Sequence, residues 1–230
     1  KLPSGYNRID NAMLAAGCDE AVHSDVTSDI KGFNNGTWDS YFLVENVWTK
    51  NYEGIRIVNR FLEKIDELKM PVKPTTSGTN EELVRTRERM KGEAHFLRAY
   101  FYFELVRAYG DVPFTLKTLT VEEANRIERT SAIAIMDWIA EELDAIVEYL
   151  PISFTDELSP ETGRANRMMC LALKARTLLY KASPLFNNEN NKEWWLDAVR
   201  ANGEVLLRAQ EWGIGLDRYS KIWGPRNGDG

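Results

Sequence analysis

One segment of the sequence combines aromatic, amide and carboxylate side chains in the manner that saccharide binding requires. It runs from Asp29 to Phe42 and reads Asp-Ile-Lys-Gly-Phe-Asn-Asn-Gly-Thr-Trp-Asp-Ser-Tyr-Phe. Aromatic rings stack on the apolar side of a sugar ring, and amide or carboxylate groups hydrogen-bond to its hydroxyls. Gly32 and Gly36 bracket Asn34 and Asn35, so we expect a turn there. The segment therefore predicts a loop with the chemistry of a sugar contact.

Trp38 is an aromatic residue within this polar loop, and two roles are open for it. Its ring either stacks on a ligand or folds down onto the domain, as most loop aromatics do. For Phe33, Tyr41 and Phe42 the favoured position is the core, with ligand contact as the alternative. Tyr41 is kept among the candidate ligand contacts because it lies in the same segment.

The sequence gives no case for catalysis. The two histidines, His23 and His95, have no Ser, Cys or acidic partner at a recognisable spacing. Hydrolysis of a glycosidic bond needs two carboxylates facing each other across a cleft. The acidic residues between Glu141 and Glu148 are instead interpreted as the solvated face of a helix. We therefore predict a protein that is not an enzyme and that uses no cofactor.

Metal binding is not predicted either. The carboxylates that could serve as calcium ligands are those of Asp19, Glu20, Asp25 and Asp29, but their spacing is not that of an EF-hand loop. Solvated or helix-capping roles are favoured for them.

The two cysteines, Cys18 and Cys170, match no zinc or redox motif. Cys170 lies in an apolar helical run and is expected to be a small buried packing residue. Whether the two form a disulfide is left open.

The composition is that of a globular protein with a sizeable core. The chain has 230 residues, of which 43% are hydrophobic and 28% charged, and its formal net charge is −6. Lysines and arginines are interleaved with acids, so no basic surface for nucleic acid is predicted. No run of about 18 apolar residues is present that would span a membrane.

The elements that must position the loop are predicted to be helices. Apolar residues recur at three- and four-residue steps, and capping residues, prolines and glycines separate the runs. The predicted helices cover residues 44–68, 81–109, 130–150, 165–181 and 194–209. No convincing pair of strands is found.

The helix predicted over residues 81–109 is apolar on two sides, which indicates packing on two sides. One stripe contains Leu97 and Phe101, and the other contains Phe96 and Phe103. Gly110 suits a left-handed C-terminal position, beyond which Pro113 prevents continuation.

Helices joined by short loops form antiparallel hairpins. Ala99 with Phe103, and Ala175 with Leu179, keep the Ala-x-x-x-large step of tetratricopeptide (TPR) repeats. We predict an all-α fold, a TPR-like stack of antiparallel helical hairpins with long loop insertions, forming a single domain over residues 1–230.

Four parts of the sequence together resemble the SusD/RagB family of outer-membrane glycan-binding lipoproteins. The most specific runs from Gly92 to Phe103, reading Gly-Glu-Ala-His-Phe-Leu-Arg-Ala-Tyr-Phe-Tyr-Phe, and continues through Tyr109–Phe114. The others are Asn51–Leu62, then Glu142–Asp144 leading to Leu150–Pro151, and finally Gly163–Asn166 followed by Ala172–Arg176 and Leu179–Tyr180. Because family chains are longer than this sequence, we expect it to be the N-terminal part of a longer SusD-like protein.

The resemblance implies a role as well as a TPR-rich fold. Family members capture oligosaccharides at the cell surface for a partner TonB-dependent transporter of the SusC type. They are anchored in the outer membrane by a lipid on an N-terminal cysteine, and Cys18 is too far inside the matched region to be that residue. The resemblance also assigns ligand-facing roles to Trp38 and to Asn34 or Asn35.

The sequence also allows two alternative functions. TPR-like repeats bind helices or peptides in their concave groove, so the chain is alternatively a protein-interaction module that docks the transporter, with sugar contacts elsewhere. A helical hydrolase is the third reading.

Overall fold

The computed structural model describes residues 8–9, 12–39, 46–67, 80–154 and 163–215. The chain divides into two compact units, Lys1–Thr49 and Lys50–Gly230, and each is described by itself. The single domain predicted over residues 1–230 stays a prediction.

The first unit contains short elements only. Strand β1 (Arg8–Ile9) pairs antiparallel with β2 (Ala12–Met13), the 3₁₀ helix η1 (Leu14–Gly17) follows directly, and α1 (Lys31–Asn35) comes later. A small apolar cluster holds these elements together, formed by Ala12, Ala16 and Ile30.

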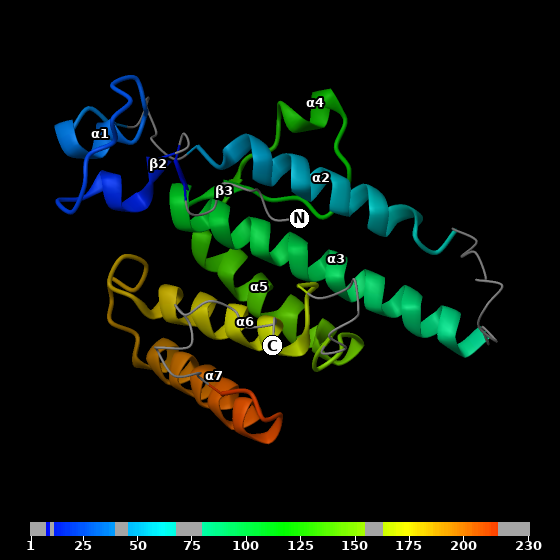
Figure 1. Cartoon of the computed structure of the whole chain (residues 1–230). Coiled ribbons are helices and arrows are strands. Elements are labelled where there is room, and N and C mark those ends of the chain that lie inside the picture. The colour runs from blue at the N-terminus through cyan, green and yellow to red at the C-terminus, as the bar shows by residue number, and fades with distance from the viewer. Residues whose placement is uncertain (1–7, 10–11, 40–45, 68–79, 155–162, 216–230) are drawn as a thin grey trace, which may run out of the picture. The chain divides into compact units, whose positions relative to one another are not determined.

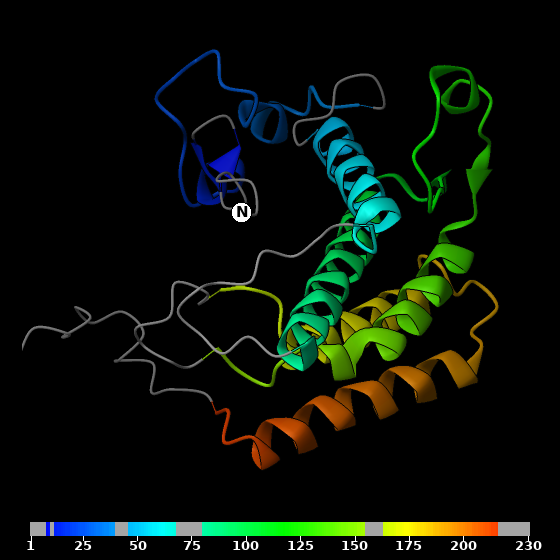
Figure 2. The same cartoon turned by 90° about the vertical axis from the view of Figure 1, so that its right-hand side faces the viewer.

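The second unit is built from long helices. In chain order its elements are α2 (Trp48–Lys64), α3 (Asn80–Tyr109), β3 (Val112–Pro113), α4 (Val121–Ala124), β4 (Arg129–Thr130), α5 (Ala132–Ile146), η2 (Val147–Tyr149), α6 (Arg167–Ala182) and α7 (Lys192–Glu211). In Figures 1 and 2, α3, α5, α6 and α7 follow one another through this unit, while α2 and α4 lie on the other side of α3. The predicted all-α, TPR-like stack of helical hairpins is confirmed.

Capping residues set the beginnings of three helices, each within two residues of the predicted start. The Ser131, Asn166 and Asn191 side chains each accept a hydrogen bond from a backbone N–H in the first turn of α5, α6 and α7. Gly110 has a φ of +68° and its N–H donates to Val106 O over 2.9 Å, which ends α3 in the predicted left-handed conformation.

Other boundaries differ from the prediction. The predicted helix 130–150 is α-helical only to Ile146, and its last turn tightens into η2. The predicted helix 44–68 begins at Trp48 and ends at Lys64, with 44–45 and 68 outside the described residues. The expected absence of strand pairs is wrong in two places, where two-residue strands pair antiparallel as β1 with β2 and β3 with β4.

Helix α3 packs on two sides, as predicted. One side contacts α5 and α6, and there the ring of Phe103, which is almost completely buried, meets that of Tyr180 of α6 with 5.3 Å between the centroids. On the other side Phe101 lies so close to Gly54 of α2 that a Cβ on that glycine would be 2.5 Å from the ring. Leu97, expected in a buried stripe, is 36% exposed.

A polar network joins α2, α3 and α5 to the segment after β3. Arg98 is 5% exposed; its Nη2 lies 2.7 Å from Glu142 Oε1 and its Nη1 lies 3.0 Å from Asn59 Oδ1. Asn59 in turn donates to the carbonyl oxygen of Lys117 over 3.0 Å, and His95 Nδ1 lies 2.5 Å from Glu142 Oε1. Glu142 is therefore not part of a solvated face, as the sequence suggested, but the counterion of a buried arginine.

None of the helices in the described ranges combines the length and the apolar character that crossing a bilayer requires.

Candidate functional site

The candidate loop follows α1 in the first unit. Backbone N–H groups of Lys31 and Gly32 donate to the carbonyl oxygens of Ser28 and Asp29 over 3.2 and 2.9 Å, which starts the helix. It ends at Gly36, which has a φ of +68°. Only glycine adopts this conformation without strain, so the chain reverses there toward Trp38. The turn predicted at Asn34 is therefore a short helix, and the turn comes at its end.

Each of the two asparagines is held by hydrogen bonds at one of the two polar atoms of its side-chain amide. Asn34 Nδ2 donates to the carbonyl oxygen of Cys18 over 3.2 Å. Asn35 Oδ1 accepts from Thr37 N over 3.1 Å and from Thr37 Oγ1 over 2.7 Å, which is an Asx-type turn. Among the described residues, the Asn34 amide oxygen and the Asn35 amide nitrogen have no partner, so one acceptor and one donor remain for a ligand.

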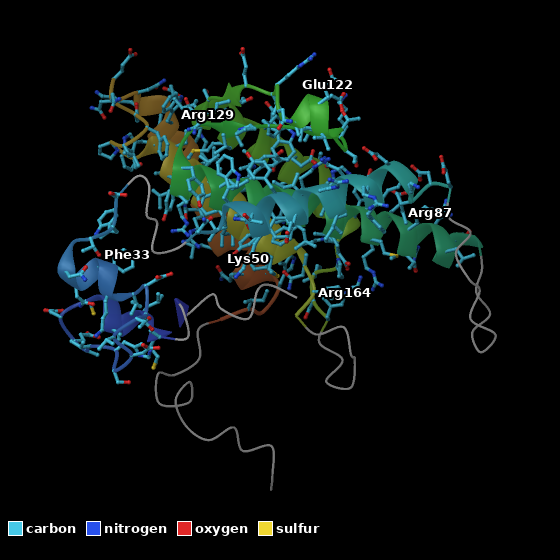
Figure 3. All side chains as sticks on the ribbon, turned by 90° about the horizontal axis from the view of Figure 1, so that it is seen from above. Phe33, Lys50, Arg87, Glu122, Arg129 and Arg164 are labelled. Atoms are coloured by element: carbon cyan, nitrogen blue, oxygen red, sulfur yellow. The ribbon has the colours of Figure 1, made fainter. Side chains whose placement is uncertain are left out.

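Trp38 is exposed rather than folded into a core. It is 54% accessible, and its ring meets that of Phe33 edge to face, with 5.9 Å between the centroids. Phe33 lies on α1 (Figure 3) and is 40% exposed, so its expected core position is wrong. Gly17 of η1 lies so close to Phe33 that a Cβ on this glycine would be 3.1 Å from the Phe33 ring. Helix η1 therefore supports the Phe33 ring, and the Phe33 ring in turn supports Trp38.

The structure thus brings Asn34, Asn35 and Trp38 into one short stretch with free polar and aromatic surface. Tyr41 and Phe42 lie outside the described residues. Cys18 and Thr37 are contacts of the site that sequence reasoning missed. The Asn35-x-Thr37 spacing was a usable signal for the Asx turn, whereas the contact to Cys18, 16 residues away, had none.

The loop that leads into α1 is held by a second turn of the same kind. Asp25 Oδ1 accepts from Thr27 N over 2.9 Å and from Thr27 Oγ1 over 2.8 Å. These hydrogen bonds hold the pKa of Asp25 below its ordinary value. The carboxylate has a local structural role, in keeping with the preference for capping roles among the acids of this region.

The described part of the chain holds no cluster of metal-binding side chains and no disulfide. No group of three His, Cys, Asp or Glu side chains there is placed to hold a metal ion. Both cysteines are free; Cys18 is exposed and Cys170 is buried. Burial raises the pKa of the Cys170 thiol to about 12, and its predicted packing role is confirmed.

The second unit has a cleft of about 330 Å³ between α5, α6 and α7. Its charged lining is Asp137, Lys174, Lys181, Asp197, Arg200 and Glu204. Lysines of α6 pair with carboxylates of α5 here, Lys174 with Asp144 over 2.6 Å and Lys181 with Asp137. These ion pairs join neighbouring helices, so the cleft is accounted for by helix packing.

A comparison with known proteins shows the family to which the chain belongs. A SusD-like family model, described as starch-binding associating with outer membrane, matches residues 9–179. The chain belongs to the SusD-like family. The match includes the Trp38 loop and the helices α2, α3 and α5.

Individual SusD-like relatives are longer than this chain. A SusD-like protein of Formosa agariphila is 23% identical over 184 residues, which are 80% of this chain and 30% of that protein. A SusD-like carbohydrate-binding protein from Bacteroides fragilis is 30% identical, with a TM-score of 0.54 over 73% of this chain and 28% of its own. Another SusD-like protein from Bacteroides fragilis is 29% identical, with a TM-score of 0.60 over 85% and 34%. The chain spans about a third of the length of these relatives.

Proposed function

We propose that this SusD-like chain takes part in non-catalytic capture of oligosaccharides at the cell surface, for uptake through a partner SusC-like TonB-dependent transporter. Trp38 stacks on a sugar ring, while Asn34 and Asn35 hydrogen-bond to its hydroxyls and Tyr41 adds a further contact. The protein acts at the outer membrane and is held there by a lipid anchor.

The observation that carries this proposal is the exposure of Trp38. An aromatic side chain that is 54% accessible, supported by a second ring and flanked by two half-used amides, has the parts that a sugar contact needs. The name of the 30% identical relative, a carbohydrate-binding protein, supports the same class of ligand.

Titration calorimetry tests the proposal with the whole chain and a panel of neutral oligosaccharides, starting with maltoheptaose because the family model names starch. Trp38→Ala is expected to weaken binding at least about tenfold, since it removes both buried apolar area and ring stacking. Trp195→Ala is the matched control, because Trp195 is also exposed, at 38%, but lies on α7. Equal affinities of the parent and the Trp38 variant would remove this residue from the site.

A specific observation favours the second candidate, a protein-interaction module. On α6 and α7, Leu179, Val199 and Leu206 are 44%, 66% and 73% exposed, and Val199 and Leu206 share one face of α7. On this alternative the apolar surface of α6 and α7 docks the SusC-like transporter, and sugar contacts lie elsewhere. Co-purification with that transporter, lost in Val199→Glu and kept in Trp38→Ala, would support it.

A further inference from the structure

The unit that carries the Trp38 loop is strongly acidic. Residues 1–49 contain seven Asp or Glu and three Lys or Arg, which gives a side-chain charge of −4 at pH 7. The count includes every basic residue of the unit, so ion pairing within it leaves this total unchanged. Residues 50–230 contain 28 acidic and 26 basic residues and are therefore also negative, by −2.

Several of these carboxylates lie close to the candidate contacts. Asp19 and Glu20 are exposed and directly follow Cys18, whose carbonyl oxygen is 3.2 Å from Asn34 Nδ2. Asp39 is exposed and is the residue after Trp38. Against them, α1 contributes one cation, Lys31. A sugar lying on the Trp38 ring would thus be surrounded by negative potential.

We propose that the Trp38 loop takes uncharged glycans and discriminates against sulfated and uronic-acid glycans of the same backbone. This inference rests on the proposed function, since it names the ligand class of the same site. Neutral hydroxyls gain from nearby carboxylates, which accept their hydrogen bonds. A sulfate or carboxylate on the ligand instead meets like charge that Lys31, the one cation of α1, offsets only in part, and such contacts oppose a wrong partner.

The size of the effect follows from Coulomb's law with screening. Two like charges about 10 Å apart in water repel each other weakly. At about 0.15 M salt the screening length is about 8 Å, which weakens the repulsion further. Summed over a unit of charge −4 and an oligosaccharide with about four sulfates, the repulsion is expected to weaken binding about tenfold. At about 1 M salt the screening length falls to about 3 Å and the difference should vanish.

The experiment compares backbone-matched pairs on the whole chain: maltoheptaose with sulfated maltoheptaose, and dextran with dextran sulfate. Affinities are measured at about 0.15 M and about 1 M salt for the parent chain and for the double variant Asp19→Asn/Glu20→Gln. The variant halves the charge of the unit, so the expected discrimination falls from about tenfold to about threefold. Glu141→Gln/Glu189→Gln is the control, because it removes the same charge from exposed positions of the second unit.

The outcomes separate this inference from the function on which it rests. Tighter binding of the neutral member supports the inference if the difference in affinity vanishes in high salt, narrows in the Asp19/Glu20 variant and stays the same in the control variant. Equal or tighter binding of the sulfated member would overturn the charge selectivity and leave glycan capture standing. Binding of neither member of any pair would overturn both.

Discussion

Replacement of Glu142 by Gln should destabilise the second unit, because it leaves Arg98 buried without its counterion. The Arg98 side chain is 6% exposed and that of Glu142 is 15% exposed, and 2.7 Å separates Nη2 from Oε1. Gln keeps the size of the side chain and one carbonyl acceptor but removes the charge. The packing of α5 is therefore little changed, and the measured difference reports on the ion pair.

The magnitude follows from the partners that Arg98 keeps. Removing one partner of a fully buried pair costs about 3–5 kcal/mol, and a hydrogen bond to a charged group contributes about 1.5–3 kcal/mol. Glu142 retains some solvent contact, and Arg98 still donates to Asn59 over 3.0 Å and lies over the Trp138 ring. We therefore expect a loss of about 2–3 kcal/mol in the free energy of unfolding.

The assay is urea unfolding of the whole chain followed by circular dichroism. Glu141→Gln is the control, since Glu141 is its exposed neighbour on α5 and its change should stay within about 0.5 kcal/mol. If the two variants are equally stable, the buried ion pair does not stabilise the fold and this reasoning is wrong.

The pH dependence of the same variant gives a second check. Burial acts to raise the pKa of Glu142, but hydrogen bonds from His95 and Arg98 outweigh it, so the pKa lies below its ordinary value of 4.5. A folded-state pKa below the unfolded one means that this carboxylate contributes its full stability above about pH 5. The contribution is lost as pH falls through the folded-state pKa. The stability gap between the parent chain and Glu142→Gln should therefore narrow as the pH falls below 4.5.

Two further predictions concern packing. Gly203→Ala should stabilise the chain by about 0.5–1 kcal/mol, because a Cβ there meets nothing within 4 Å and Ala favours the helix. Gly54→Ala should instead destabilise the chain by about 1 kcal/mol, because the Cβ of the new alanine would lie 2.5 Å from the Phe101 ring. Urea unfolding measures both variants, and a higher stability of the Gly54 variant than of the Gly203 variant would contradict this packing. A thiol reagent should modify the exposed Cys18 but not the buried Cys170 in the native chain. After unfolding, the reagent should modify both cysteines. If neither cysteine reacts in either state, the two form a disulfide.

The long helices could be predicted from sequence because their signals are local. Apolar periodicity located α3, and Gly110 marked an end of this helix that the structure confirms. Helix α4 was missed although Thr120 and Glu123 form a complete capping box, because it has four residues and no buried face. Short elements of this kind leave too few residues for a period to be detected.

What the sequence could not give is the pairing of polar groups far apart in the chain. Glu142 has the same spacing as the exposed acids of α5, and only the fold brings it to Arg98, 44 residues earlier. Asn59 is likewise 1% exposed, although polarity alone would place it at the surface. For the candidate site, residue types predicted a sugar-like composition, but whether Trp38 faces solvent depends on the ring of Phe33 and on its support at Gly17.

The residues that mark the family most clearly therefore serve the scaffold. In the segment Gly92–Phe103, Arg98 and His95 bind Glu142, while Ala94, Ala99 and Phe103 are buried. The partners Arg98, His95 and Glu142 all belong to the second unit, whereas Trp38 belongs to the first. Changes at sites that share no partner have additive effects, so stability and glycan affinity should separate. Glu142→Gln should lower the free energy of unfolding and leave the affinity of the folded chain unchanged, whereas Trp38→Ala should do the reverse. A loss of affinity in folded Glu142→Gln chains would show that the scaffold network also shapes the binding loop.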